Sequence, residues 1–387
     1  MFFSSGLSDT SLLHPTSVAS NRIKPILFIF HELFFLPDQF FQRSVGTAAH
    51  FFLSNTKIII PMPLLHTRDH QAPFWLPNGH FQSIFPALFR KIRDVTYLRE
   101  QIVTPDDDFL NLDWAKTTQP TKKGLVILSH GLEGDSKRQY ILGMVRALTR
   151  QGYDCLAWNY RSCGGEMNKQ LRFYHSGATD DLDLVVRHAL QKGYRNVSLM
   201  GFSLGGNLTL KYAGEQGTLL SPEIKKVVVF SVPMDLLACS RAIEKPANWV
   251  YLKRFLSSLK PKVTEKSKVF PEHIRVDDYT KVKTFYDFDH IYTATLHGFD
   301  GADDYYARNS SKFFVESITV PTLIVNALND PLVPAESLPQ AQIATMPNVW
   351  LELTQEGGHC GFRSHTLEDD LYWSERRALE FLESSKN

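Results

Sequence analysis

Three polar residues of this 387-residue chain, Ser203, Asp330 and His359, have the types and the order that acyl transfer requires. A serine hydroxyl is a poor nucleophile at neutral pH unless a base removes its proton, and an imidazole base needs a partner that fixes its tautomer. Each residue follows an apolar run typical of a parallel strand, so we expect all three at one edge of a sheet. We interpret Ser203 as the nucleophile, His359 as the base and Asp330 as the residue that orients it. A simple turn at Asp330 and an exposed loop at His359 are the alternatives.

The turn around Ser203 has the pattern Gly-x-Ser-x-Gly, from Gly201 to Gly205. The apolar run before it and the helical pattern after it predict a strand, a sharp turn and a helix. Glycine at both positions lets the strand and the helix pass closely, because a Cβ there would collide with the facing element. The backbone N–H of Leu204, at the helix start, is then a candidate donor to an oxyanion. A glycine-rich turn without chemistry is the alternative.

A second candidate donor is the backbone N–H of Leu132, which follows an apolar strand and the pair His130-Gly131. We assign His130 a structural role, because it precedes the nucleophile in the chain. The other histidines are also interpreted as structural, among them His80, His175, His290 and His297.

Strand and helix patterns alternate along most of the chain, which predicts an α/β fold: a mostly parallel twisted sheet with helices on both faces. The expected buried strands are 125–129, 154–158, 197–200, 227–231, 320–327 and 349–353. The expected helices are 140–151, one that Thr179 or Asp180 caps and that runs to 192, and a closing helix at 367–382. A hairpin is expected at 95–115, with a solvated acidic turn at 106–108.

Two regions depart from this alternation. Residues 233–319 have helical stretches and many aromatic side chains, which predicts a cap inserted above the carboxyl edge of the sheet. Its aromatic residues either line an acyl pocket or only pack the cap against the body. Residues 1–61 contain ten phenylalanines and seven charged residues. We interpret them as a dispensable extension to a hydrolase domain at 62–387; an amphipathic membrane anchor is the alternative.

The composition sets further limits. Net charge is +1 and no basic stripe is present, which argues against a nucleic-acid partner. Cys155, Cys163, Cys239 and Cys360 have no C-x-x-C spacing, so we expect neither a metal site nor a cofactor, and free thiols favour the cytoplasm. Peripheral association with a membrane through the N-terminal segment is the alternative location.

The chain resembles the YheT-like esterases, family 4 of the AB hydrolase superfamily. The matching text includes FWLPNGHFQSIFP, SHGLEGDSKRQY, GFSLGGNLTLKY, VPTLIVNALNDPLVP and GGHCGF, and the likeness runs from about residue 70 to the C-terminus. The resemblance implies the α/β-hydrolase fold, charge-relay roles for Ser203, Asp330 and His359, and hydrolysis of carboxylic esters, in some relatives of short- or medium-chain acyl lipids. The sequence Arg161-Ser162-Cys163-Gly164 departs from the more usual Arg-Gly-Cys-Gly.

We therefore expect a serine hydrolase that cleaves a small-molecule acyl ester through an acyl-enzyme on Ser203. An acyltransferase or a thioesterase with the same triad is one alternative, because both share the acyl-enzyme step. A non-catalytic receptor that uses the hydrolase fold as a binding pocket is the other.

Overall fold

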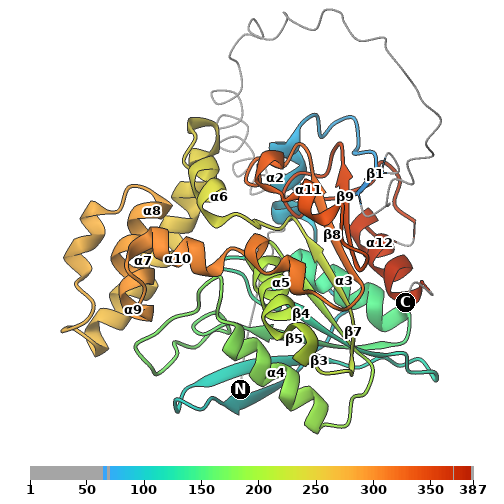
Figure 1. Ribbon diagram of the computed structural model, residues 1–387, viewed down its shortest axis with the longest axis horizontal. Coiled ribbons are helices and arrows are strands. Elements are labelled where there is room, and N and C mark those ends of the chain that lie inside the picture. Colours follow the sequence, from blue (N-terminus) through green and yellow to red (C-terminus); the bar gives the residue numbers. More distant parts are fainter. Residues whose placement is uncertain (1–63, 68–69, 369, 385–387) are drawn as a thin grey trace, which may run out of the picture. The chain divides into compact units, whose positions relative to one another are not determined.

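The computed structural model describes residues 64–67, 70–368 and 370–384. Its described strands form a nine-stranded sheet in the order β1-β9-β8-β7-β6-β4-β5-β3-β2 (Figure 1). The strands are β1 Leu64–Thr67, β2 Leu98–Val103, β3 Phe109–Ala115, β4 Gly124–Ser129, β5 Tyr153–Asn159, β6 Val197–Phe202, β7 Ile224–Phe230, β8 Thr322–Ala327 and β9 Val349–Thr354. The pairs β2–β3 and β3–β5 are antiparallel, and all other pairs of neighbouring strands are parallel. The predicted mostly parallel α/β sheet is confirmed.

Two layers of helices cover the sheet (Figure 1). One hydrophobic core joins α4 (Thr179–Gln191) and α5 (Leu204–Gln216) to one face, and a second joins α3 (Gln139–Arg150) and α12 (Trp373–Glu383) to the other. Successive residues of β4 point into different cores: Leu125 and Ile127 into the first, Val126 and Leu128 into the second. This alternation follows from the two-residue period of a strand, and burial on both faces explains why these strands are almost wholly apolar.

Three details of the helices differ from the sequence-based expectation. Neither Thr179 nor Asp180 caps α4, because the N-cap residue is Ala178 and it makes no side-chain cap hydrogen bond. The last helix begins at Trp373, later than expected. Helix α2 (Gly79–Phe89) was not predicted as a helix, because Pro86 lies inside it and its text is rich in aromatic residues. The side chain of Asn78 caps its amino end, which is the signal that the sequence offered.

All of the chain between β7 and β8 is described, and it contains helices and no strand. We call residues 233–319 the cap. Its α-helices are α6 Leu236–Ile243, α7 Trp249–Val269, α8 Phe285–Phe288, α9 Thr295–His297 and α10 Gly301–Asn309, with a π-helical turn at Asp289–Ala294. In Figure 1, α7 to α10 lie together at the left of the view, away from the strands. One hydrophobic cluster, which includes Val263, Phe285 and Tyr292, joins α7, α8 and the π-helical turn, and a second one, which includes Ala302 and Tyr306, contains α10.

The loop after β5 is fixed by a buried arginine. Arg161 donates hydrogen bonds to Asp106, Asp108 and Asp181, at distances from 2.8 to 3.1 Å. The expectation of a wholly solvated turn at 106–108 is therefore wrong for Asp108, which is completely buried. The next residue, Ser162, has a φ of +63°, a conformation that favours glycine. The departure from Arg-Gly-Cys-Gly thus falls where the backbone is left-handed.

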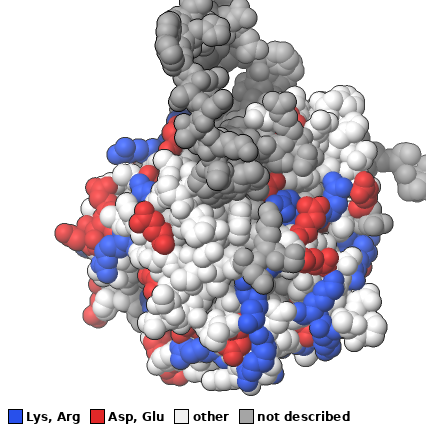
Figure 2. All heavy atoms as spheres, turned by 45° about the vertical axis from the view of Figure 1, so that its right-hand side comes forward, with Lys and Arg blue, Asp and Glu red and all other residues white. Residues whose placement is uncertain are grey.

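On the face of the molecule shown in Figure 2, basic and acidic side chains are intermingled around an area without charged side chains.

None of the helices in the described ranges combines the length and the apolar character needed to cross a bilayer.

Candidate active site

Ser203 lies on the turn between β6 and α5, with a φ of +55° and a ψ of −123°. This backbone is strained for a residue with a Cβ. The two flanking glycines permit it, as the sequence suggested: a Cβ on Gly201 would lie 2.3 Å from the carbonyl oxygen of Gly205, and a Cβ on Gly205 would lie 2.4 Å from that of Ser129. The strand and the helix can therefore approach closely enough to present the Ser203 hydroxyl above the sheet.

The structure brings together the three side chains singled out in the sequence. His359 Nε2 lies 2.8 Å from Ser203 Oγ, and His359 Nδ1 lies 2.8 Å from Asp330 Oδ2. Asp330 follows β8 and His359 follows β9, so the parallel strands deliver all three groups to one edge of the sheet. The Asp330 carboxylate is fully buried, whereas 15% of the His359 side chain remains exposed.

The other oxygen of Asp330 is held by the backbone. Its Oδ1 accepts hydrogen bonds from the N–H groups of Leu332, at 2.8 Å, and Val333, at 3.2 Å. These bonds fix the carboxylate, so that Oδ2 faces the imidazole. Because Oδ2 of an ionised carboxylate can only accept, His359 Nδ1 carries the proton, and Nε2 is left as an acceptor toward Ser203.

The two candidate oxyanion donors belong to the same site. Leu132 and Leu204 line one cavity together with Ser203 and His359. Leu204 is the first residue of α5, so its N–H has no acceptor within the helix. The Leu132 N–H donates to no backbone or side-chain group within the described ranges. The loop that carries it is close to the nucleophile, because a Cβ on Gly131 would lie 3.2 Å from that of Ser203.

Sequence reasoning missed a set of polar residues that joins the loops of Asp330 and His359. Gln82 Oε1 accepts from the Gly357 N–H at 2.7 Å and from Asn329 Nδ2 at 2.9 Å. Asn329 Oδ1 accepts from the Gly358 N–H at 3.0 Å, and Ser83 Oγ accepts from the His359 N–H at 2.7 Å. Gln82 and Ser83 lie on the buried face of α2.

His130 has the structural role expected of it. Its ring is fully buried, with Nδ1 2.8 Å from the Gly131 carbonyl oxygen and Nε2 accepting from the Tyr160 N–H. Burial lowers the pKa of His130 to about 3, so the ring is neutral at pH 7. His297 is held between the backbone carbonyl groups of Thr293 and Phe173. His80 lies 3.3 Å from the Tyr251 hydroxyl.

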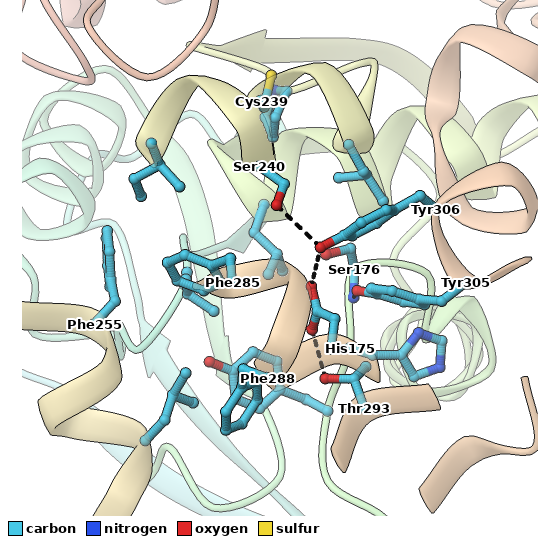
Figure 3. A pocket seen from close by; sticks show the side chains of 18 of the residues that line it. His175, Ser176, Cys239, Ser240, Phe255, Phe285, Phe288, Thr293, Tyr305 and Tyr306 are labelled. Atoms are coloured by element: carbon cyan, nitrogen blue, oxygen red, sulfur yellow. Dashed lines mark hydrogen bonds between the residues drawn. The ribbon is translucent and has the colours of Figure 1, made fainter. Parts of the chain in front are cut away.

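A cavity of about 150 Å³ extends from Ser203 and His359 under the cap. Most of its walls are apolar, and Phe255, Phe285 and Phe288 line one side of it (Figure 3). Phe285 and Phe288 both line this cavity and pack in the hydrophobic cluster of the cap, and the interpretation of the cavity as an acyl pocket stays a prediction.

The opposite side of the cavity is polar. Asp289 lines it and accepts hydrogen bonds from the hydroxyls of Thr293, at 2.6 Å, and Tyr306, at 2.8 Å; Tyr306 also approaches Ser240 (Figure 3). Loss of solvation raises the pKa of Asp289 to about 6. No lysine or arginine forms an ion pair with this carboxylate among the described residues.

The described residues contain no group of three or more His, Cys, Asp or Glu side chains arranged to hold a metal ion. All four cysteines are free. Loss of solvation raises the pKa of the Cys360 thiol, next to His359 in the chain, above its ordinary value.

A mostly parallel sheet that presents a serine on a sharp turn between a strand and a helix is the architecture of the α/β hydrolases. Residues 124–366 match the family model described as alpha/beta hydrolase fold, and the chain belongs to this family. Its similarity to YheT of Escherichia coli, described as a candidate esterase, confirms the resemblance stated above: the two are 32% identical over 309 residues, which cover 79% of this chain and 90% of YheT.

Two other proteins extend the comparison. The phospholipase ABHD3 of Bos taurus is 34% identical, over 76% of this chain and 74% of its own. The solved structure of the Pyrococcus furiosus esterase Pf2001 is 18% identical, with a TM-score of 0.49 over 82% of this chain and 96% of that one. The similarity to YheT and ABHD3 indicates that this chain is a hydrolase.

Proposed function

We propose that this protein is a serine hydrolase that cleaves carboxylic esters through an acyl-enzyme on Ser203. The observation that carries the proposal is the hydrogen-bond chain from Ser203 through His359 to Asp330, with both bonds at 2.8 Å, at the mouth of an apolar cavity. This arrangement has the geometry of a nucleophile, a general base and an orienting carboxylate.

In the first half of the reaction, Ser203 Oγ attacks the ester carbonyl carbon while His359 Nε2 takes the hydroxyl proton. Asp330 stabilises the imidazolium that forms. The N–H groups of Leu132 and Leu204 donate to the oxyanion of the tetrahedral intermediate. When that intermediate collapses, the ester C–O bond breaks, and His359 gives its proton to the leaving alkoxide.

In the second half, water takes the place of the alcohol. His359 removes a proton from the water as its oxygen attacks the acyl carbon, and the same oxyanion donors act again. Collapse breaks the bond to Ser203 Oγ, which recovers its proton from His359. The net reaction converts an ester and water into an acid and an alcohol, and no metal or organic cofactor takes part.

The cavity supports a short- or medium-chain acyl or lipid-like substrate. Its volume of about 150 Å³ is that of protein cavities which hold a molecule about the size of benzene. A chain of about six carbons is therefore the expected optimum for the part of the substrate under the cap. The names of the relatives, an esterase and a phospholipase, support the same class of bond.

The test is a series of p-nitrophenyl esters of graded chain length. We expect turnover with an optimum near six carbons, and a loss of at least about 10³-fold in kcat for Ser203→Ala. A fluorophosphonate should label the wild-type protein at Ser203 and should not label this variant. Binding of esters without turnover or labelling would instead identify a receptor, and transfer of the acyl group to an added alcohol faster than to water would identify an acyltransferase.

A further inference from the structure

Glu133 immediately follows Leu132, the proposed oxyanion donor, and its backbone is held in an unfavourable conformation. Its φ is +53°, in the left-handed region that side chains with a Cβ disfavour. Such a conformation persists only where its surroundings hold it. Here the Glu133 N–H donates to the Tyr174 hydroxyl at 2.9 Å, and its carbonyl oxygen accepts from the Arg138 guanidinium.

The Glu133 side chain points into the protein, where its carboxylate pairs with one cationic side chain among the described residues. Its carboxylate accepts from the Tyr174 hydroxyl at 2.8 Å and from Lys262 Nζ at 2.7 Å. The Glu133 side chain is 7% exposed and that of Lys262 is 19% exposed. Burial disfavours the Lys262 ammonium, but Cys163 and Glu133 outweigh this effect and hold the pKa of Lys262 above its ordinary value. Lys262 is therefore protonated at neutral pH, and its Nζ lies within ion-pair distance of the Glu133 carboxylate.

The two partners come from different parts of the fold. Glu133 belongs to the loop after β4, in the body, and Lys262 belongs to α7, in the cap. Lys262 also lines the cavity, as do Leu132 and Ser203. Asn248, the N-cap residue of α7, donates to the Pro331 carbonyl oxygen at 2.7 Å, next to Asp330. Helix α7 and its N-cap residue thus contact the loop of the proposed oxyanion donor and the loop of Asp330.

We propose that Lys262 is a positioning residue for the oxyanion hole, so that docking of the cap helix α7 sets the Leu132 N–H in place. Without the ammonium, the Glu133 carboxylate is buried with only a hydroxyl partner, which is costly. It gains solvation by turning outward, and that movement releases the left-handed backbone and displaces Leu132. The inference rests on the proposed function, because it assigns Leu132 a role in that reaction.

The test compares Lys262→Met with Lys262→Arg. The methionine keeps the length of the side chain and removes the charge, so we expect kcat to fall about 10- to 100-fold, less than or close to the loss of one oxyanion donor. KM for a p-nitrophenyl ester should change by no more than about twofold, because a methionine of similar size keeps the shape of the cavity wall that Lys262 lines. Lys262→Arg keeps the cation and should retain most of the activity. Lys260→Met, an exposed residue of the same helix, is the matched control.

A second readout separates positioning from mere structural support. An alkyl trifluoromethyl ketone forms an anionic adduct with the serine, so its affinity depends on the oxyanion donors. The control is the methyl carbinol with the same alkyl chain, which only fills the cavity. In Lys262→Met the affinity for the ketone should fall by the same factor as kcat, with the affinity for the carbinol unchanged. Glu133→Gln combined with Lys262→Met should be no worse than Lys262→Met alone, because both remove the same interaction.

Unchanged kcat and ketone affinity in Lys262→Met, or an equal loss of ketone and carbinol binding, would overturn the inference while the proposed function stands. A wild-type protein without Ser203-dependent turnover would overturn both.

Discussion

At the scale of single residues, the proposed reaction depends on the tautomer of His359. Asp330 Oδ1 is held by two backbone N–H groups, which leaves Oδ2 as the atom that faces His359. In Asp330→Asn, Oδ1 keeps its backbone bonds and an NH₂ group faces Nδ1. The imidazole must then carry its proton on Nε2, where it cannot accept the Ser203 proton.

We therefore expect Asp330→Asn to fold normally and to lose about 10³- to 10⁴-fold in kcat. Steady-state kinetics at pH 7 and at pH 9, together with a thermal melt, would check this. A variant with near-wild-type kcat would show that Asp330 does not set the tautomer.

Asp289 gives a prediction about stability. Its pKa of about 6 in the folded protein lies above the ordinary 3.8, because the cavity wall solvates its charge poorly. Below pH 4 the carboxyl is protonated in both the folded and the unfolded states and has no effect. Between pH 4 and 6 only the unfolded state releases the proton, so stability falls as the pH rises, and above pH 6 the full cost remains. The groups that face it, Thr293, Tyr305 and Tyr306, are uncharged in this range.

Asp289→Asn removes this cost and keeps polar atoms for both hydroxyl partners. Because part of Asp289 is exposed to the cavity, we expect a gain in the free energy of unfolding of about 1–2 kcal/mol at pH 8 relative to pH 4. Urea denaturation of the variant and the wild type at pH 4 and at pH 8 measures this difference in the free energy of unfolding. A gain that is equal at pH 4 and pH 8 would exclude ionisation of Asp289 as its cause.

At the scale of elements, helix α2 connects the surface to the site. Its buried face carries Gln82 and Ser83, which form hydrogen bonds with the loops of Asp330 and His359. Leu88 and Phe89, on the same helix, are exposed. A Cβ on Gly79, its first residue, would lie 1.8 Å from the Asn329 carbonyl oxygen. The start of the helix is therefore packed against the loop that carries Asp330. The position of His359 thus depends on an element that contributes no proposed catalytic residue.

We expect Gln82→Leu to lower kcat about 10-fold or more with little change in KM. The substitution leaves the Gly357 N–H and the Asn329 amide without their acceptor, which also costs about 1–3 kcal/mol of stability. Kinetics on a p-nitrophenyl ester with parallel chemical denaturation would measure both effects. Leu88→Gln, on the exposed face of α2, is the control. Equal kinetics in the two variants would show that the Gln82 contacts do not position His359.

Helix α2 also shows where the sequence-based reading stops. The strands and the Gly-x-Ser-x-Gly turn were predictable, because buried strands are continuous apolar runs and the turn needs glycine at fixed places. Gln82, Ser83 and Lys262 gave no such signal, because the contacts through which each acts are with residues far away in the chain. Asp108 was misjudged for the same reason: its partner Arg161 lies 53 positions further on.

At the scale of the whole molecule, the domain division at Met62 remains a proposal, because residues 1–61 lie outside the described ranges. The first described strand, β1, pairs parallel with β9 along its whole length, from Leu64 opposite Leu351 to Thr67 opposite Thr354. Strand β9 leads directly to the loop of His359. The hydrolase domain therefore needs β1, and a boundary at Met62 retains it.

Two truncated proteins test this boundary. One that starts at Met62 should keep the wild-type kcat/KM and melting temperature, because all strands of the sheet remain. One that starts at Gln71, behind an added initiator methionine, loses β1 and exposes the edge of β9. At about 0.5–1.5 kcal/mol for each hydrogen bond lost, it should be destabilised by about 2–5 kcal/mol and lose activity as the His359 loop loosens.

The same pair of proteins decides between the two interpretations of residues 1–61. If the segment is a dispensable extension, the full chain and the Met62 protein will sediment equally with phospholipid vesicles. Vesicle binding by the full chain alone, with equal turnover of a soluble ester by both, would instead assign these residues to an amphipathic membrane anchor, since the ten phenylalanines are the apolar side chains that such binding requires. Loss of soluble-ester turnover in the Met62 protein would refute the boundary itself, because it would mean that the site needs residues before β1.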